Sequence, residues 1–348
     1  MKISMRGRLA VCLCICAALG LTGCGWSGGR TRIVRVSHGQ SETHPEHIGL
    51  LAFKAHVEQA LGEKYEIQIF PNEILGASQK AIELTQTGAI DFVVAGTANL
   101  ETFAKIYEIF SMPYLFKSEA AYYKAMGEAD NMKELYASTD EAGFRVLTWY
   151  SAGTRNFYAK RPIQRPEDLK GMKIRVQQSP ASVNMVQAFG AAAAPMSFGE
   201  VYTAIQQGVI DGAENNELAL TNNKHGEVAK YFANNKHQMV PDMLVANLKF
   251  LNSLTEEERA VFEEAAAIST EVELEEWDKQ VQAARETAER DMGVQFIDVD
   301  VEAFREKVRP LHESMMKANP NIRPIYEHFQ EVNRNTQPEP GEGEAEAE

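Results

Sequence analysis

Between residues 33 and 95 the sequence reads IVRVS (33–37), HIGLLAFKAHVEQAL (47–61), EIQIF (66–70), SQKAIELTQT (78–87) and IDFVVA (90–95). Short β-rich runs alternate here with longer runs of helical periodicity, which is the order of βαβ units. The turn residues Pro71-Asn72 and Thr87-Gly88 separate them. The last run is apolar almost throughout, as expected of a strand buried on both faces of a parallel sheet. These residues predict an α/β fold.

The rest of the chain continues this alternation. Strands are predicted at 144–150, 156–159, 173–177, 239–250 and 294–299, and helices near 180–189, 198–207, 301–318 and 322–335. Thr255 and the three glutamates after it are typical of a helix N-cap with an acidic first turn. Apolar spacing carries this helix to about residue 290, which is long for a globular domain. The sequence has no fixed-period repeat, which argues against a solenoid.

Length and charge limit the classes of function. The chain has 348 residues, more than one hydrophobic core usually holds, so we expect two domains with a cleft between them. Its formal charge is −14, and without Lys2, Arg6 and Arg8 it becomes 32 minus 49, or −17. This charge repels nucleic acid and gives no attraction to anionic lipid. An anionic ligand therefore requires a local cluster of arginines.

The amino terminus has the pattern of a bacterial lipoprotein signal. A basic start is followed by 13 uncharged residues at 9–21, too few for a membrane span of about 20 residues. The run ends in Leu21-Thr22-Gly23-Cys24, in which a small residue precedes the cysteine that carries the lipid. We expect a signal peptide at 1–23, acylation of Cys24 and a flexible tether at 24–31. An ordinary signal cut elsewhere and an uncleaved anchor are the alternatives.

The other cysteines fit an exported chain. Cys12, Cys14 and Cys16 lie within the predicted signal peptide, so the mature chain has no thiol beyond Cys24. Disulfides, thiol catalysis and cysteine metal sites are excluded together. We expect the protein outside the cytoplasm, held by its lipid at the periplasmic face or the outer surface of a bacterial membrane. Residues 336–348 are acidic and lack bulky apolar side chains, which predicts a disordered tail.

Common catalytic motifs are missing from the sequence. It has no Gly-x-Ser-x-Gly, phosphate loop, Gly-x-Gly-x-x-Gly or His-Glu-x-x-His, so a secreted enzyme is not favoured and no cofactor is predicted. Four histidines near the amino end offer a metal-binding lipoprotein as an alternative, with Glu42 or Glu46 as further ligands. These histidines are His38, His44, His47 and His56. Loop histidines more often bond to water or backbone, and His44 or His47 could instead donate to a ligand at the mouth of the cleft.

The strongest candidates for ligand binding are two arginines twenty residues apart, Arg155 and Arg175. A guanidinium is always charged, and its planar fork matches a carboxylate bidentately. On paired strands of a two-domain cleft, the two side chains could hold one carboxylate together. A single surface arginine is usually a solvated charge, and the spacing alone does not decide between these interpretations.

Several motifs in register around these arginines define a resemblance. They are FPN at 70–72, LG at 75–76, TGAID at 87–91, MPYLF at 112–116, GTR at 153–155, PEDLKGMKIR at 166–175, GEVYTAIQQG at 199–208 and VIDGAEN at 209–215. Together they resemble the DctP-type solute receptors of TRAP (tripartite ATP-independent periplasmic) transporters. The resemblance covers residues 32–335.

The resemblance implies a two-domain α/β fold of the periplasmic-binding-protein kind, with two chain crossovers, a hinge and a long helix that bridges both domains. We expect domain I to contain residues 32–152 and 241–280, and domain II residues 153–240 and 281–335. Partners of such a receptor are a small carboxylate and the permease subunits of the transporter.

The same resemblance assigns roles to single residues. It implies that Arg175 clamps the ligand carboxylate, that Arg155 is the second arginine and that Asn215 orients the carboxylate. By position it adds polar groups from the loops after the first strands, namely His44, Ser78, Gln79 and Asn99.

The amides around the arginines point to the class of anion. Gln177 lies two residues after Arg175, and Asn215 is followed by Asn216 and Glu217. These groups suit several sugar hydroxyls, and the pattern resembles hexuronate receptors. Asn216 and Glu217 could instead only cap a helix. Tyr150 and Phe198 could stack on a sugar face or pack in the core. A four-carbon dicarboxylate remains the second candidate ligand, but Arg161, Arg165 and Lys173 are not obviously placed to bind its far end.

Overall fold

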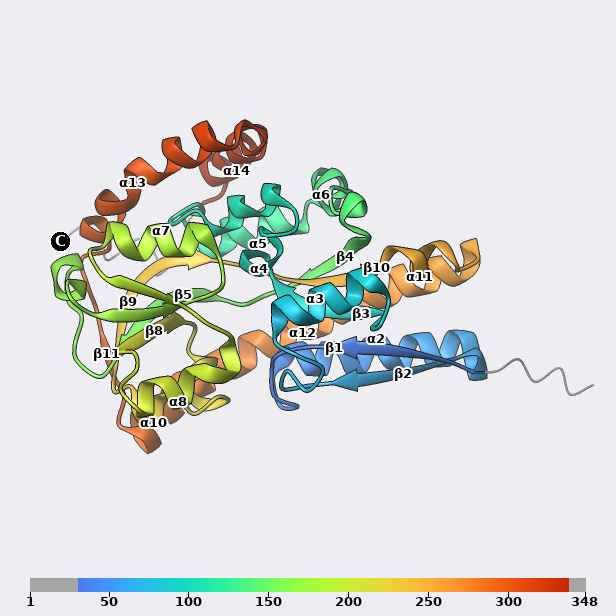
Figure 1. Cartoon of the computed structure of the whole chain (residues 1–348), viewed down its shortest axis with the longest axis horizontal. Coiled ribbons are helices and arrows are strands. Elements are labelled where there is room, and N and C mark those ends of the chain that lie inside the picture. The colour runs from blue at the N-terminus through green and yellow to red at the C-terminus, as the bar shows by residue number, and fades with distance from the viewer. Residues whose placement is uncertain (1–30, 338–348) are drawn as a thin grey trace, which may run out of the picture.

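The computed structural model describes residues 31–337 and contains two β-sheets side by side, each covered by helices (Figure 1). The predicted signal peptide, Cys24, most of the predicted tether and most of the predicted tail lie outside the described residues. Within the described part, no helix is both long and apolar enough to cross a membrane.

The first sheet contains the βαβ units predicted at the start of the chain. Its strand order is β2 (Tyr65–Phe70), β1 (Arg32–Ser37), β3 (Phe92–Gly96), β10 (Asp242–Asn247) and β4 (Phe144–Tyr150). β1 is parallel to both of its neighbours, whereas β10 is antiparallel to β3 and β4. Helices α2 (Pro45–Leu61) and α3 (Ser78–Thr87) connect the parallel strands. All of β3 is buried, as predicted for a central strand.

The second sheet has the order β11 (Gln295–Ile297), β9 (Tyr231–Met239), β5 (Thr154–Ala159), β8 (Gly212–Asn215), β6 (Lys173–Val176) and β7 (Ala192–Pro195). Helices α7 (Pro180–Ala188) and α8 (Val201–Gln206) follow β6 and β7. One sequence prediction is wrong here. The segment 239–250 is not a single strand, because β9 ends at Met239, β10 occupies Asp242–Asn247 and the chain then turns into helix α11 (Leu248–Asn252).

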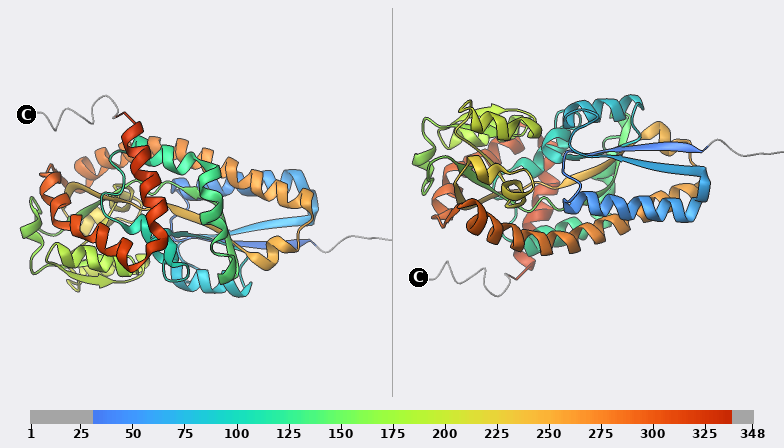
Figure 2. Two further views of the ribbon diagram at one scale, coloured as in Figure 1. Left: turned by 90° about the horizontal axis from the view of Figure 1, so that it is seen from above. Right: turned by 90° about the horizontal axis from the view of Figure 1, so that it is seen from below.

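Two strand connections join the sheets. β4 continues into β5 through residues 151–153, and β9 continues into β10 through residues 240–241. Helix α12 (Glu256–Met292) runs along both sheets (Figure 2) and, with 37 residues, is about 55 Å long. Thr255 caps its first turn together with Glu258. The predicted two crossovers and the long bridging helix are therefore confirmed.

The remaining helices pack around the two sheets. They are α4 (Thr97–Leu100), α5 (Glu119–Gly127), α6 (Ala129–Ala137), α9 (Leu218–Thr221), α10 (His225–Val228), α13 (Val301–Ala318) and α14 (Arg323–Asn335). Phe304 and Val308 at the start of α13 pack in the core of the second sheet, but Met316, Phe329 and Val332 pack against the first sheet. The segment 319–335, which we predicted in domain II, thus packs against α5 and residues 105–111 and contributes its apolar side chains to the core of the first sheet.

The connection between β4 and β5 is tightly packed against α12. Gly153 has a φ of +58°, and a Cβ atom there would lie 2.5 Å from Cζ2 of Trp277. Ser151 donates its backbone N–H to Glu273 at 2.9 Å, and Tyr150 bonds Ser269 through its hydroxyl at 2.8 Å. These contacts therefore hold the connection between β4 and β5, which is one of the two hinge segments, in a fixed position on α12.

We predict that Gly153→Ala destabilises the fold more than Gly293→Ala. Both glycines have a left-handed φ, which costs a substituted residue about 1–2 kcal/mol, but a Cβ at Gly293 meets no atom within 4 Å. The contact with Trp277 should add roughly 1–3 kcal/mol of overpacking. Urea unfolding of both variants measures the difference. Equal losses of unfolding free energy would show that the Trp277 side chain moves aside at no energetic cost when residue 153 has a Cβ atom.

Candidate functional site

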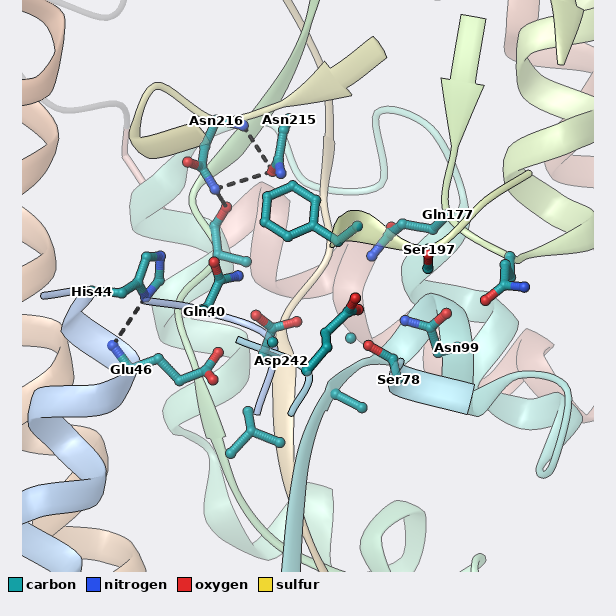
Figure 3. Close-up of a pocket in the computed structure, with 18 of the residues that line it drawn as sticks. Gln40, His44, Glu46, Ser78, Asn99, Gln177, Ser197, Asn215, Asn216 and Asp242 are labelled. Carbon is teal, nitrogen blue, oxygen red and sulfur yellow. Dashed lines mark hydrogen bonds between the residues drawn. The ribbon is translucent and has the colours of Figure 1, made fainter. Parts of the chain in front are cut away.

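A cavity of about 680 Å³, including its opening to solvent, lies between the two sheets (Figure 3). Its walls come from the carboxyl-terminal ends of β1, β3, β6 and β8, from the crossovers and from α12, which is where open α/β sheets bind ligands. Nine of the predicted site residues line it. They are His44, Ser78, Asn99, Arg155, Arg175, Gln177, Phe198, Asn215 and Asn216.

Arg155 forms a buried ion pair with Glu214 of the neighbouring strand β8. Its Nε donates to Glu214 Oε2 at 2.5 Å, and Nη2 donates to Oε1 at 3.0 Å and to the Glu214 carbonyl at 2.9 Å. Nη1 donates to Asn215 Oδ1 at 3.0 Å. Arg155 is only 3% exposed, so its charge is compensated inside the protein.

The ionisation of Glu214 follows from this pair. Burial by itself would raise the pKa of Glu214, but the charge of Arg155, the nearby His237 and the hydrogen bonds from Arg155 outweigh burial and lower this pKa to about 2. Glu214 is therefore a carboxylate at any physiological pH. Removal of either partner would leave a buried uncompensated charge.

Arg175 has a different environment. It is also 3% exposed, but Nε and Nη2 both donate to the carbonyl of Met196, at 3.1 and 2.9 Å. Its guanidinium lies 5.7 Å from the centroid of the Phe198 ring. Among residues 31–337, no carboxylate lies within ion-pair distance of it. Burial lowers the pKa of Arg175, as expected for a cation whose charge is only partly compensated.

Amide groups surround the two arginines. Asn215 Oδ1 accepts from Arg155 and from the backbone N–H of Asn216, which fixes the orientation of the Asn215 amide (Figure 3). Gln177 Oε1 is buried and has no hydrogen-bond partner within the described residues. Asn216 has both roles that the sequence left open. It lines the cavity, and its Oδ1 accepts from the N–H of Leu218 at the start of α9.

Three predicted site residues lie outside the cavity. Tyr150 is fully buried in the core of the first sheet, because at the end of β4 its side chain points towards Ser269 of α12. Gln79 does not line the cavity, and its Nε2 donates to the carbonyl of Gln178 at 3.5 Å. Glu217 turns to the opposite side of the hinge and lines a separate groove there.

Acidic residues form the part of the cavity that the sequence did not reveal. Glu46, in the first turn of α2, and Asp242, the first residue of β10, both line it and lie close enough for each to affect the ionisation of the other. Burial raises the pKa of Glu46 to about 8. Burial and then the neighbouring Glu46 raise the pKa of Asp242 well above its usual value. This pair therefore holds a proton near neutral pH.

Two further acids, Glu73 and Glu101, connect the two lobes, each lobe being one sheet with its surrounding helices. Glu73, in the loop after β2, accepts the backbone N–H of Gly199 in the second lobe at 3.2 Å. Glu101, at the end of α4, accepts from the hydroxyl of Ser179 at 2.8 Å and from the N–H of Ala181 at 3.2 Å. Both contacts tie the first lobe to a helix start in the second, where the free backbone N–H groups favour a carboxylate. The cavity is thus in a closed arrangement.

The histidines near the amino end do not form a metal site. His38 Nε2 lies 2.9 Å from His47 Nδ1, and His44 caps α2 by accepting the N–H of Glu46 at 3.2 Å. Burial lowers the pKa of His38 to about 4 and that of His44 to about 3, so both are neutral. In the part of the chain that the structure describes, no three His, Cys, Asp or Glu side chains are arranged to hold a metal ion.

Trp277 of α12 completes the cavity at the hinge. Its ring meets that of His44 edge-on, with centroids 5.8 Å apart, and it packs over Gly153. Sequence reasoning missed Trp277 because an aromatic residue within a long helical pattern has no feature that separates it from core packing. An acidic residue directly after Pro241 at a strand start was the only available signal for Asp242.

Two lobes joined by two strand crossovers, with a cavity between them that contains a buried arginine, unpaired within the described residues, define the class of periplasmic solute receptors. A comparison with family models places residues 36–319 in the DctP family, bacterial extracellular solute-binding protein family 7. The chain therefore belongs to this family, whose members are solute-binding receptors.

Known solute-binding proteins are similar to this chain in structure and in sequence. A TRAP periplasmic solute-binding protein of Anaerococcus prevotii DSM 20548, solved with bound α/β-D-glucuronate, is 48% identical, with a TM-score of 0.87 over 88% of this chain and 100% of that one. One of Sulfitobacter sp. NAS-14.1, with bound β-D-galacturonate, is 31% identical, with a TM-score of 0.82 over 88% and 100%. The C4-dicarboxylate-binding periplasmic protein DctP of Rhodobacter capsulatus is 28% identical over 81% of this chain and 86% of its own.

The raised pKa of Glu46 predicts a pH dependence of stability. Between about 4.5 and 8 the folded state keeps a proton that the unfolded state has lost, so unfolding free energy falls as pH rises through this window. The buried histidines act in the opposite sense, but only below their usual pKa of 6.5. We expect the ligand-free protein to lose stability from pH 6.5 to 8.5, and Glu46→Gln to reduce that loss.

Thermal unfolding at several pH values measures this effect. Glu63→Gln, which changes an exposed carboxylate, is the matched control and should keep the wild-type slope. An identical slope for Glu46→Gln and the wild type would mean that Glu46 is ionised in the folded protein.

Proposed function

We propose that this TRAP solute receptor captures a hexuronate in the cavity between its lobes, holds the ligand carboxylate on Arg175 and delivers it to a membrane permease. The observation that carries the proposal is the buried Arg175, which has no carboxylate partner within the described residues. A buried cation of this kind is stabilised by an anionic ligand. Arg155, already paired with Glu214, contributes position and not free charge.

The rest of the cavity supports a polyhydroxy acid. Its lining supplies amides from Gln177, Asn215 and Asn216 together with carboxyl groups, which donate to and accept from sugar hydroxyls in fixed geometry. The Phe198 ring beside Arg175 offers an apolar face to a sugar ring. The similar receptors with bound glucuronate and galacturonate support the same ligand class.

A four-carbon dicarboxylate is the second candidate ligand, as in the Rhodobacter relative. Its far carboxylate needs a second cation. Arg161, Arg165 and Lys173 are exposed and do not line the cavity, and Arg155 is already neutralised. The remaining lining side chains with charge are acidic. This distribution favours a monocarboxylate.

Binding here requires no chemical step. Glu73 and Glu101 connect the lobes across the cavity, so opening at the two crossovers and closing on the ligand is sufficient for capture and release. We infer that the protein is a receptor and not an enzyme.

Arg175→Ala should abolish measurable binding of D-glucuronate. Two charge-assisted hydrogen bonds of about 1.5–3 kcal/mol each correspond to a loss of at least about 100-fold in affinity. Arg175→Lys keeps the charge but not the fork, and should lose less. Isothermal titration calorimetry measures both variants, with the exposed Arg161→Ala as control. Unchanged affinity in Arg175→Ala would refute the clamp.

The same titration separates the candidate ligands. Tighter binding of succinate or malate than of glucuronate would make the protein a dicarboxylate receptor. A thermal shift with zinc and with no organic acid would favour the metal-binding lipoprotein.

We also propose that the receptor is attached to a bacterial membrane through lipid on Cys24, outside the described residues. The support is the sequence Leu21-Thr22-Gly23-Cys24 after an uncharged run. Cys24→Ser should lose metabolic labelling with palmitate and leave the membrane fraction, whereas Cys16→Ser should behave as wild type. Continued labelling of Cys24→Ser would show that the anchor lies elsewhere.

A further inference from the structure

Glu73 lines the ligand cavity from the loop between β2 and α3 and contacts the second lobe across it. Its Oε2 accepts the backbone N–H of Gly199 at 3.2 Å, and a Cβ atom at Gly199 would lie 2.7 Å from this oxygen. The contact is therefore close enough that a side chain on residue 199 would displace Glu73. Ser78 and Ser197 mark the two segments in Figure 3, on the side of the cavity away from His44.

The other oxygen of the same carboxyl group has no partner among the described residues. Glu73 Oε1 is buried and makes no hydrogen bond within residues 31–337. It lies on the side of Gly39, another lining residue, where a Cβ atom would be 3.9 Å from it. Burial of a carboxyl oxygen without a hydrogen-bond partner is unfavourable. A ligand hydroxyl in the cavity would supply that partner, and a carboxyl group can bond a hydroxyl whether or not it is ionised.

The loop holds Glu73 in an unfavourable backbone conformation. Asn72 and Glu73 both have a φ of +57°, in the left-handed region that disfavours residues with a side chain. Their backbone N–H groups donate to the carbonyls of Gln40 and His38, at 3.0 and 3.1 Å, which fixes this conformation. Backbone strain of this kind persists only where surrounding contacts impose it, and it is concentrated at ligand-binding positions. The loop is thus arranged to present Glu73 to the cavity.

Gly199 belongs to the segment that also contacts Arg175. Arg175 donates twice to the carbonyl of Met196, and its guanidinium lies 5.7 Å from the centroid of the Phe198 ring. The hydrogen bond from Gly199 to Glu73 therefore holds the same segment, 196–199, that positions the arginine. A ligand that contacts Glu73 of the first lobe and Arg175 of the second would bond to both lobes and stabilise their closed arrangement.

We propose that Glu73 is a specificity-determining residue, which bonds a hydroxyl of the bound sugar acid through Oε1 while Oε2 holds the second lobe closed. Recognition of the hydroxyl and closure over the ligand then depend on one carboxyl group. The receptor therefore prefers a hydroxylated acid to an acid of the same shape that lacks this hydroxyl. The inference rests on the proposed function, because it assumes that Arg175 holds the carboxylate of the same ligand.

Glu101 also connects the lobes, but it does not line the cavity. Its Oε1 accepts from the hydroxyl of Ser179 at 2.8 Å and from the N–H of Ala181 at 3.2 Å, and its Oε2 accepts from the hydroxyl of Ser111 at 2.8 Å. Both oxygens of Glu101 thus have partners within the protein. Glu101 can stabilise closure but has no oxygen left for a ligand, which makes it the matched control for Glu73.

Calorimetric titration with D-glucuronate and with its monodeoxy derivatives, one for each hydroxyl, tests the inference. In the wild type, removal of the hydroxyl that Glu73 bonds should cost about 10- to 100-fold in affinity. In Glu73→Ala, removal of the same hydroxyl should cost less than about 3-fold, because its partner is already absent. Glu101→Ala should weaken the binding of all these acids by a similar factor and keep the wild-type cost of each deoxy change.

Gly199→Ala tests the same contact from the second lobe and serves where Glu73→Ala folds poorly. Its Cβ atom should displace Glu73 and reduce the cost of removing the same hydroxyl. Equal costs of every deoxy change in the wild type and in both variants would overturn the inference and leave the proposed function intact. An equal reduction in Glu101→Ala would assign the effect to closure alone and refute the contact with a hydroxyl. Failure of the wild type to bind D-glucuronate would overturn both the inference and the proposed function.

Discussion

The buried ion pair between Arg155 and Glu214 gives the two arginines of the cavity different functions. Since Glu214 neutralises Arg155 on the adjacent strand, only Arg175 keeps a charge for a ligand. Two uncompensated guanidinium groups at this depth would repel each other and cost far more desolvation free energy. The pair also orients Asn215 through Nη1 of Arg155. One interaction therefore sets both the charge on this side of the cavity and the orientation of Asn215.

The opposite wall depends on the order of the strands. Because β10 enters the first sheet between β3 and β4, the first residue after the second crossover lies beside the carboxyl end of β3. This insertion brings Asp242 to the cavity that Glu46 of α2 also lines. The same crossovers hold the two lobes together, and α12 packs against both, so Glu46 and Asp242 on one lobe and the arginines on the other can separate and meet again without loss of either local arrangement.

The sequence predicted the features that are local and missed those that the fold assembles. Alternating periodicity was sufficient for the βαβ units, and contiguous motifs were sufficient to place Arg155, Arg175 and Asn215 in one cavity. Glu46 and Asp242 are almost two hundred positions apart, and no periodicity links them. Tyr150 was misplaced for a related reason. The sequence gives the alternation of side chains along β4, but which face meets α12 depends on tertiary packing.

The cavity also explains how an acidic protein can bind an anion with selectivity. The formal charge of −14 disfavours loose association of anions with the surface, so capture depends on the local field at Arg175. Inside the cavity that field is confined to one guanidinium, because Glu214 neutralises Arg155 and the other lining side chains that can carry charge, apart from the neutral His44, are acidic. A carboxylate placed at Arg175 would compensate a buried charge, whereas a carboxylate placed at Arg155 would add an uncompensated one.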